Sequence, residues 1–153
     1  MQIETILAPR RTLCAQQGGS KKRVLERLAQ AIAQDIPSID ADDLFRSLIA
    51  RERLGSTGIG HGIAIPHCRV KDCPSTIGAL ITLARPIDYD AIDSEPVDIL
   101  FALLVPEEAH DEHLQTLAAL AGAFSDNTYR QTLRQSTNNE MLYQSAVVLP
   151  ESP

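Results

Sequence analysis

The sequence predicts an α/β sandwich of three layers, a central β-sheet with helices on both faces. Two continuous apolar runs of strand length, residues 78–84 and 98–105, have the pattern of strands that are covered on both faces. Segments with apolar residues at helical spacing lie before and after these runs along the chain. Strands that alternate with helices in this order favour one sheet between two helical layers.

The first half of the chain is expected to hold two helices. Ser20 is a suitable N-cap for a helix to about residue 34, whose apolar residues fall on one face. Pro37 then breaks the chain, and Asp40 can cap a second helix that ends at Arg51. Shorter elements are expected around these helices: a helical turn at 3–7, a strand at 12–15 and a short strand at 63–65.

The second half is expected to hold the two central strands and three further helices. A polar connection with a short edge strand near Ile87 separates the two apolar runs. Pro106 ends the second run, and Glu107 and Glu108 open a helix that carries His113 near its start. Asp126 and Asn127 end this helix, and two short helices are expected at 128–134 and 138–146.

Composition limits the classes to which the chain can belong. Its 153 residues are expected to form one domain, 1–153, with about 1–10 and 147–153 peripheral. A formal net charge of -6 argues against binding duplex nucleic acid, and no apolar run approaches the ~18 residues of a membrane span. The N-terminus lacks a secretory signal, and three cysteines give no even disulfide framework, so a cytoplasmic protein is expected.

One stretch, residues 51–69, combines flexible backbone, basic groups and a titratable nucleophile. It contains four of the chain's 8 glycines, and glycine lets backbone N–H groups turn toward an anion without steric cost. The loop lacks the Lys-Ser/Thr ending of a P-loop and the spacing of a dinucleotide fingerprint. Pro66 stiffens the backbone before His67, which predicts a held imidazole, as suits a nucleophile. From these residues alone, a half-buried imidazole with a structural hydrogen bond is the alternative.

The stretch also resembles a known active-site signature. Arg51-Glu-x-x-Gly-Ser-Thr-Gly-Ile-Gly60, followed by Gly62-Ile-Ala-Ile-Pro-His67, is similar to that of the IIA components of the fructose and mannitol class of the bacterial phosphotransferase system. Ala91-Ile-Asp93, the run 96–106 and His113-Leu-x-x-Leu117 look like the nitrogen-regulatory IIA proteins in particular. The resemblance covers most of the chain and implies that the sheet is mixed.

The resemblance implies that His67 is phosphorylated, with Arg51 and His113 as its partners. Phosphoryl transfer requires positioning and stabilisation of charge on the equatorial oxygens, which arginine, hydroxyl and N–H donors supply. A phosphoryl-binding loop is therefore expected at Gly55, Ser56, Thr57, Gly58 and Gly60. No metal and no cofactor is expected in such a carrier.

Two other kinds of chemistry at the site remain as alternatives. His110 and His113 have a spacing that could seat a metal, although no third ligand is visible. Cys68 could be a thiol nucleophile, but adjacent residues of a strand point to opposite faces, so Cys68 and His67 are poorly placed to act together.

The resemblance implies a cytoplasmic phosphoryl carrier that receives its phosphoryl group from a small carrier of the HPr type. Its phosphorylation state would be read by targets such as potassium transport systems or sensor kinases. A sugar-specific IIA component that passes the group to a IIB partner is the alternative. A third hypothesis is a binding module that kept the fold but is not phosphorylated.

Overall fold

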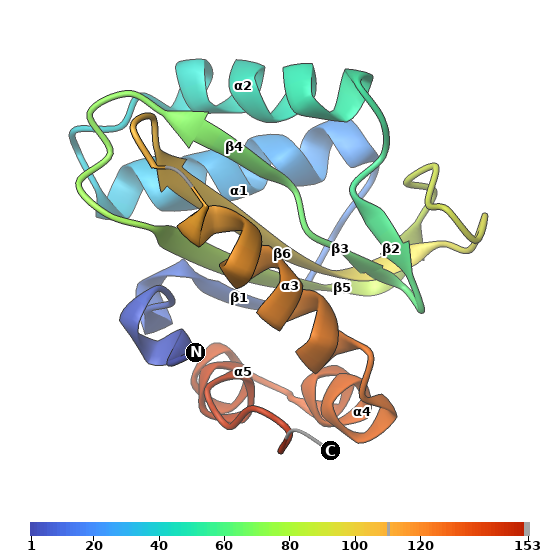
Figure 1. Cartoon of the computed structure of the whole chain (residues 1–153). Helices are drawn as coiled ribbons and strands as arrows, with labels where there is room; N and C mark the ends of the chain where they lie inside the picture. The colour runs from blue at the N-terminus through green and yellow to red at the C-terminus, as the bar shows by residue number, and fades with distance from the viewer. Residues whose placement is uncertain (110, 152–153) are drawn as a thin grey trace.

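A six-stranded mixed sheet forms the middle layer of the structure, a computed structural model that describes residues 1–109 and 111–151 (Figure 1). Its strands are β1 (Thr12–Gln16), β2 (Gly58–Gly60), β3 (Ile63–Ala64), β4 (His67–Val70), β5 (Ile77–Ile87) and β6 (Val97–Pro106). The order is β1-β5-β6-β3-β2, and β4 also pairs with β6. β5 and β6 are antiparallel, as are β2 and β3, whereas β1 is parallel to β5, and β3 and β4 are parallel to β6. The mixed sheet that the resemblance implied is confirmed.

Helices cover both faces of this sheet. Within the described residues they are α1 (Lys21–Asp35), α2 (Ala41–Arg53), α3 (Glu112–Phe124), α4 (Asn127–Gln135) and α5 (Asn139–Ala146), with 3-10 turns η1 (Ile3–Thr5) and η2 (Pro9–Arg11). α1 and α2 pack on one face with one apolar cluster, and α3, α4 and α5 pack on the other with a second cluster (Figure 1). The predicted three-layer sandwich is therefore confirmed.

The first two helices begin where the sequence predicts, because each N-cap side chain satisfies a free backbone N–H group. Ser20 accepts a hydrogen bond from the backbone N–H of Arg23 at 3.2 Å. Asp40 accepts one from the backbone N–H of Asp43 at 3.0 Å. Such caps stabilise a helix by about 0.5–2 kcal/mol each.

The apolar runs form the centre of the sheet, as predicted. β5 and β6 pair along almost their whole length, from Ile77 opposite Leu104 to Ile87 opposite Val97. Ile87 therefore belongs to the end of β5 and not to a separate edge strand as expected. The register of the pairing shifts between Thr82 and Ile87, and Ile87 then pairs with Val97. The sequence pattern does not show that β5 continues across this shift.

Three other features differ from the expectations. The N-terminal turn is not peripheral, because Ile3 and Leu7 are 0% and 2% exposed in the second cluster. α3 begins at Glu112 and not at residues 107–108, since Arg69 binds the backbone carbonyls of Glu107 and Ala109 in the preceding loop. β2 and β4 were not predicted, because both are short and neither has an alternating apolar pattern.

β3 and β4 follow the same side of β6 and are separated by Ile65 and Pro66. β3 pairs with Ile99 and Leu100, and β4 pairs with residues 103–106. The backbone N–H of Leu103 donates to the carbonyl of Pro66 at 2.9 Å. The break between the two strands thus lies immediately before His67.

None of the helices in the described ranges combines the length and the apolar character of a membrane span.

Candidate active site

His67 is the first residue of β4 and is half-buried. Its Nδ1 lies 2.8 Å from the backbone carbonyl oxygen of Ile65. A carbonyl oxygen can only accept a hydrogen bond, so Nδ1 of the neutral ring carries the hydrogen. Nε2 therefore keeps its lone pair, and the ring is held with this nitrogen available as a nucleophile.

The imidazole faces a cavity of about 350 Å³. α2, the glycine-rich loop, β2, the break between β3 and β4, and α3 all contribute to its walls. The lining residues are Arg51, Ser56, Thr57, Ile59, Ile65, His67, Leu117, Ala118 and Ala121. A mostly apolar wall with a few convergent polar groups is typical of a site that excludes water around a reacting group.

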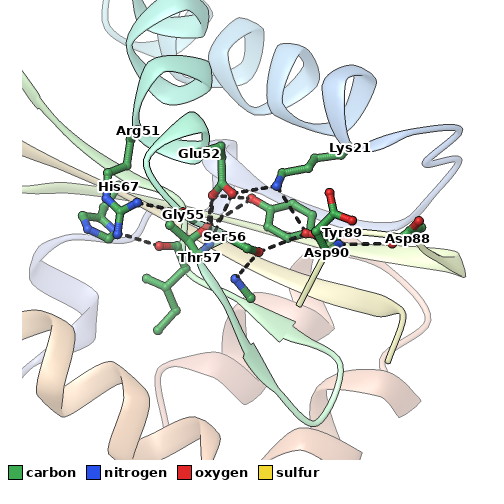
Figure 2. A network of polar contacts seen from close by, with 12 residues as sticks. Lys21, Arg51, Glu52, Gly55, Ser56, Thr57, His67, Asp88, Tyr89 and Asp90 are labelled. Carbon is green, nitrogen blue, oxygen red and sulfur yellow. Dashed lines mark hydrogen bonds and ion pairs between the residues drawn. The ribbon is translucent and has the colours of Figure 1, made fainter. Parts of the chain in front are cut away.

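Arg51 lies in the last turn of α2, and Figure 2 shows its guanidinium next to the imidazole of His67. Its Nη1 donates to the carbonyl of Gly55 at 2.8 Å, which fixes the side chain against the start of the loop. This bond uses one of the five N–H donors of the guanidinium. The arrangement brings a permanent cation to the nucleophile.

The surroundings of His67 lower its pKa below the ordinary value of 6.5. Burial is the largest cause, and the nearby Arg51 and His113 act in the same direction. The hydrogen bond to Ile65 and the charge of Glu52 oppose this shift. The net effect keeps the imidazole neutral, the form in which it is nucleophilic.

Glu52 is a functional candidate that the sequence reasoning missed. It follows Arg51, yet its side chain is 4% exposed and lies beneath the loop, where Lys21 Nζ is 2.8 Å from Glu52 Oε2 (Figure 2). The carboxylate also accepts hydrogen bonds from the hydroxyl of Tyr89 at 3.0 Å and from Thr57. One signal could have revealed it: Glu52 continues the buried i, i+4 stripe of Leu44 and Leu48 on α2.

The hydroxyl groups of the loop are engaged within the loop and its support. Thr57 is 5% exposed and its hydroxyl donates to Glu52. The hydroxyl of Ser56 donates to the carbonyl of Tyr89 at 3.0 Å and accepts the N–H of Gly58 at 3.1 Å. The N–H groups of Gly55 and Thr57 also bond to Glu52. In this arrangement the two hydroxyl groups serve the shape of the loop, and the phosphoryl-binding role expected of Gly55, Ser56, Thr57, Gly58 and Gly60 stays a prediction.

The glycines of the loop are required by packing and by backbone conformation. A Cβ at Gly58 would lie 2.7 Å from the Cβ and 2.9 Å from the Cα of Ala91, so the two backbones approach too closely for a side chain. Gly60 has φ +100°, a conformation that residues with a side chain rarely adopt. These positions therefore hold the hairpin of β2 and β3 in place.

His113 is the second residue of α3, one turn before the cavity-lining Leu117. Its Nδ1 lies 3.5 Å from Nη2 of Arg69, a residue of β4. Its charge is the smallest of the named causes that lower the pKa of His67. The expected partnership of these two histidines remains a proposal that this placement supports.

The structure bears on two alternatives for the site, a metal bound by His110 and His113 and a thiol nucleophile at Cys68. His110 lies outside the described residues, and the described ranges contain no group of three or more His, Cys, Asp or Glu side chains that could hold a metal. Cys68 packs against the core on the side of α1 and α2, opposite the cavity that His67 lines. Burial, with a smaller contribution from Cys73, raises the pKa of the Cys68 thiol to about 12, so the reactive thiolate is scarce near neutral pH.

Comparison with known proteins agrees with this geometry. Residues 5–146 match the family model described as "Phosphoenolpyruvate-dependent sugar phosphotransferase system, EIIA 2". The chain is 50% identical over 147 residues to a nitrogen regulatory protein of Pseudomonas aeruginosa, with 96% of each chain covered. It is 40% identical over 145 residues to a nitrogen regulatory protein of Escherichia coli, with 94% of this chain and 88% of the relative covered.

A solved structure gives the same result. The nitrogen regulatory protein IIA-Ntr of Neisseria meningitidis superimposes with a TM-score of 0.87 at 39% identity, over 96% of this chain and 99% of that one. The sequence match over nearly the whole chain and the shared fold lead to one conclusion. This chain belongs to the EIIA type 2 family of the phosphoenolpyruvate-dependent sugar phosphotransferase system and is similar to its nitrogen regulatory proteins.

Proposed function

We propose that the chain is a phosphoryl carrier that accepts its phosphoryl group on Nε2 of His67 from an HPr-type phosphocarrier protein. The observation that carries the proposal is the hydrogen bond between Nδ1 of His67 and the carbonyl of Ile65. It leaves Nε2 as the free nucleophile of a half-buried ring beside Arg51 (Figure 2). Within this chain, no group other than the imidazole of His67 needs to change its covalent state.

The transfer is a displacement at phosphorus. The lone pair of Nε2 attacks the phosphorus atom of the donor's phosphohistidine, the new N–P bond forms, and the donor's N–P bond breaks with its electron pair returning to the donor imidazole. Arg51 is placed to stabilise the charge on the equatorial oxygens. We assign His113, near the start of α3, a supporting role toward the same charge. The apolar walls exclude water that would hydrolyse the phosphoramidate.

We further propose that the phosphorylation state of His67 is a regulatory signal in the cytoplasm. The two relatives described above, which match over nearly their whole length, are named nitrogen regulatory proteins. Targets such as potassium transport systems or sensor kinases would distinguish the two forms of His67, because phosphorylation adds negative charge to an otherwise mostly apolar cavity. These relatives favour regulation over a sugar-specific role with a IIB partner.

Labelling with radioactive phosphoenolpyruvate tests the proposal. The chain is incubated with the general phosphotransferase and its HPr-type carrier, and we expect one phosphoryl group, stable to alkali and lost in mild acid. His67→Ala should accept none. The matched control is His61→Asn, which replaces an exposed histidine of the same loop at φ 60° by a residue that tolerates this conformation. Label on the His67→Ala protein, mapped to another residue by mass spectrometry, would contradict the proposal.

A further inference from the structure

We propose that Glu52, paired with Lys21, is a positioning residue that fixes the hydrogen of His67 on Nδ1 through Thr57 and Ile65. The proposal rests on the proposed function, since it concerns the nucleophile of that reaction. It assigns a role in transfer to a buried ion pair that touches neither the phosphoryl group nor its donor.

A continuous series of hydrogen bonds connects Glu52 to the imidazole. The carboxylate accepts the backbone N–H of Thr57, at 3.3 Å to Oε1 and 3.2 Å to Oε2, and also the Thr57 hydroxyl. The carbonyl of Thr57 accepts the backbone N–H of Ile65 at 3.0 Å. The carbonyl of Ile65 then accepts the hydrogen on Nδ1 of His67 at 2.8 Å. The position of the last acceptor in this series therefore depends on the first.

Burial and charge make Glu52 a fixed anchor. Its side chain is 4% exposed, so an approaching carrier protein cannot contact it. A buried carboxylate stays ionised only where donors and a cation compensate for the lost water. Lys21 supplies the cation, and it is fixed in turn by the carbonyl of Tyr89 at 3.2 Å and by the Tyr89 ring, whose centroid is 4.3 Å from Nζ (Figure 2).

The chemistry of the site requires a carboxylate and not an amide. An ionised carboxylate accepts hydrogen bonds at both oxygens and donates none. Here it meets only donors: the N–H and O–H of Thr57, the O–H of Tyr89 and the ammonium of Lys21. Glutamine at this position would direct an NH2 group toward one of these donors and leave Lys21 without its counter-charge. Glu52→Gln therefore disturbs the anchor with almost no change in volume.

The tautomer of His67 is the readout that separates positioning from stability. Neutral histidine in water favours the hydrogen on Nε2. An excess of the Nδ1–H form therefore measures how strongly the carbonyl of Ile65 binds that hydrogen. Nitrogen NMR of 15N-labelled imidazole measures this ratio on the unphosphorylated protein. We expect the Nδ1–H form to dominate in the parent and to fall in Glu52→Gln. The transfer rate at saturating carrier should fall on the order of 10- to 100-fold with an unchanged KM, because the ring is misplaced while the docking surface is intact.

The matched control is Asp35→Asn, which breaks another ion pair of α1 whose carboxylate is largely covered. The side chain of Asp35 is 8% exposed and pairs with Arg10 and Arg11. Asp35 and Lys21 stand at opposite ends of α1, roughly 20 Å apart at 1.5 Å per residue. Asp35→Asn should lower the melting temperature and leave the tautomer ratio and the transfer rate at the parent's values.

Two outcomes overturn the proposal. One is a Glu52→Gln protein that loses stability as Asp35→Asn does but keeps the parent's tautomer ratio and rate. If Glu52→Gln does not fold, Thr57→Val is used instead, since it removes the hydroxyl that contacts Glu52 and Tyr89. A folded Thr57→Val protein with the parent's tautomer ratio and transfer rate is the second outcome. Should His67 accept no phosphoryl group in the parent, the proposed function fails, while the NMR ratio still decides whether Glu52 positions the ring.

Discussion

The guanidinium of Arg51 can bind the loop and a phosphoryl group at the same time, which the single ammonium of a lysine does poorly. Its planar fork can bind Gly55 through Nη1 and still present further N–H donors toward a phosphoryl group. We expect Arg51→Lys to fold normally and to accept the phosphoryl group up to about 100-fold more slowly, comparable to the loss of one donor at an oxyanion hole. Rates of transfer from the phosphorylated carrier measure this.

Arg53 provides the control for Arg51. It is exposed in the same last turn of α2 and outside the residues that line the cavity. Arg53→Lys should transfer at the parent's rate. If Arg51→Lys also transferred at the parent's rate, Arg51 would be only a charged residue at the end of α2, without a role in transfer.

The lowered pKa of His67 predicts how transfer depends on pH. The folded pKa is below the ordinary value of 6.5, so the ring stays neutral as the pH falls through 6.5 and transfer decreases only at lower pH. Burial is the main cause of the lowered pKa, and Arg51 is the next of the causes that lower it. Arg51→Gln should therefore raise the pKa of His67 and move the decrease in transfer to higher pH. An NMR titration of the His67 ring checks both statements.

The same shift acts on stability. Between the folded pKa and about 6.5, the unfolded chain binds a proton at His67 that the folded chain does not. The free energy of unfolding therefore loses this contribution as the pH falls through that window and retains it above. A His67→Gln protein should lack this part of the pH dependence in chemical denaturation, and an identical profile would show that the ring has an ordinary pKa in the folded state.

At the scale of elements, the hairpin of β2 and β3 depends on how closely its first glycine approaches residue 91. Gly58→Ala places a Cβ 2.7 Å from that of Ala91, so backbone must move. We expect a loss of about 1–3 kcal/mol in the free energy of unfolding, typical of overpacking. Gly122 of α3 is the contrasting control, since a Cβ there meets nothing within 4 Å. Gly122→Ala should raise stability by up to about 1 kcal/mol in denaturant titrations.

The elements also show where sequence patterns are informative. α1 and α2 could be predicted because an N-cap and an apolar stripe act locally, within a few residues. The start of α3 could not, because the loop before it is bound by Arg69, a residue 38 positions from Glu107 in the chain. β4 was missed for a similar reason, since the strand with which it pairs, β6, is distant in the sequence.

At the scale of the molecule, the fold brings the site together from segments far apart in sequence. His67 and Arg51 could be predicted from one motif, because both lie in the stretch that resembles the family signature. Lys21 and Tyr89 could not, since their role depends on a buried carboxylate that appears in the sequence as one more charge beside Arg51. The stripe of Leu44 and Leu48 places Glu52 on the buried face of α2, but no local pattern shows that Lys21 and Tyr89 meet its carboxylate there.

The break between β3 and β4 has a consequence for how a sheet can host a reactive ring. Ile65 lies in this break, where its N–H donates to the carbonyl of Thr57, and pairing along β6 resumes at the carbonyl of Pro66. Proline cannot donate to the ladder, so the chain skips one rung here. The carbonyl of Ile65 accepts the hydrogen on Nδ1 of His67, two residues ahead in its own chain, and holds the ring. A local interruption of regular structure thus supplies the acceptor that orients the imidazole, and the continuity of β6 beneath it keeps that interruption rigid.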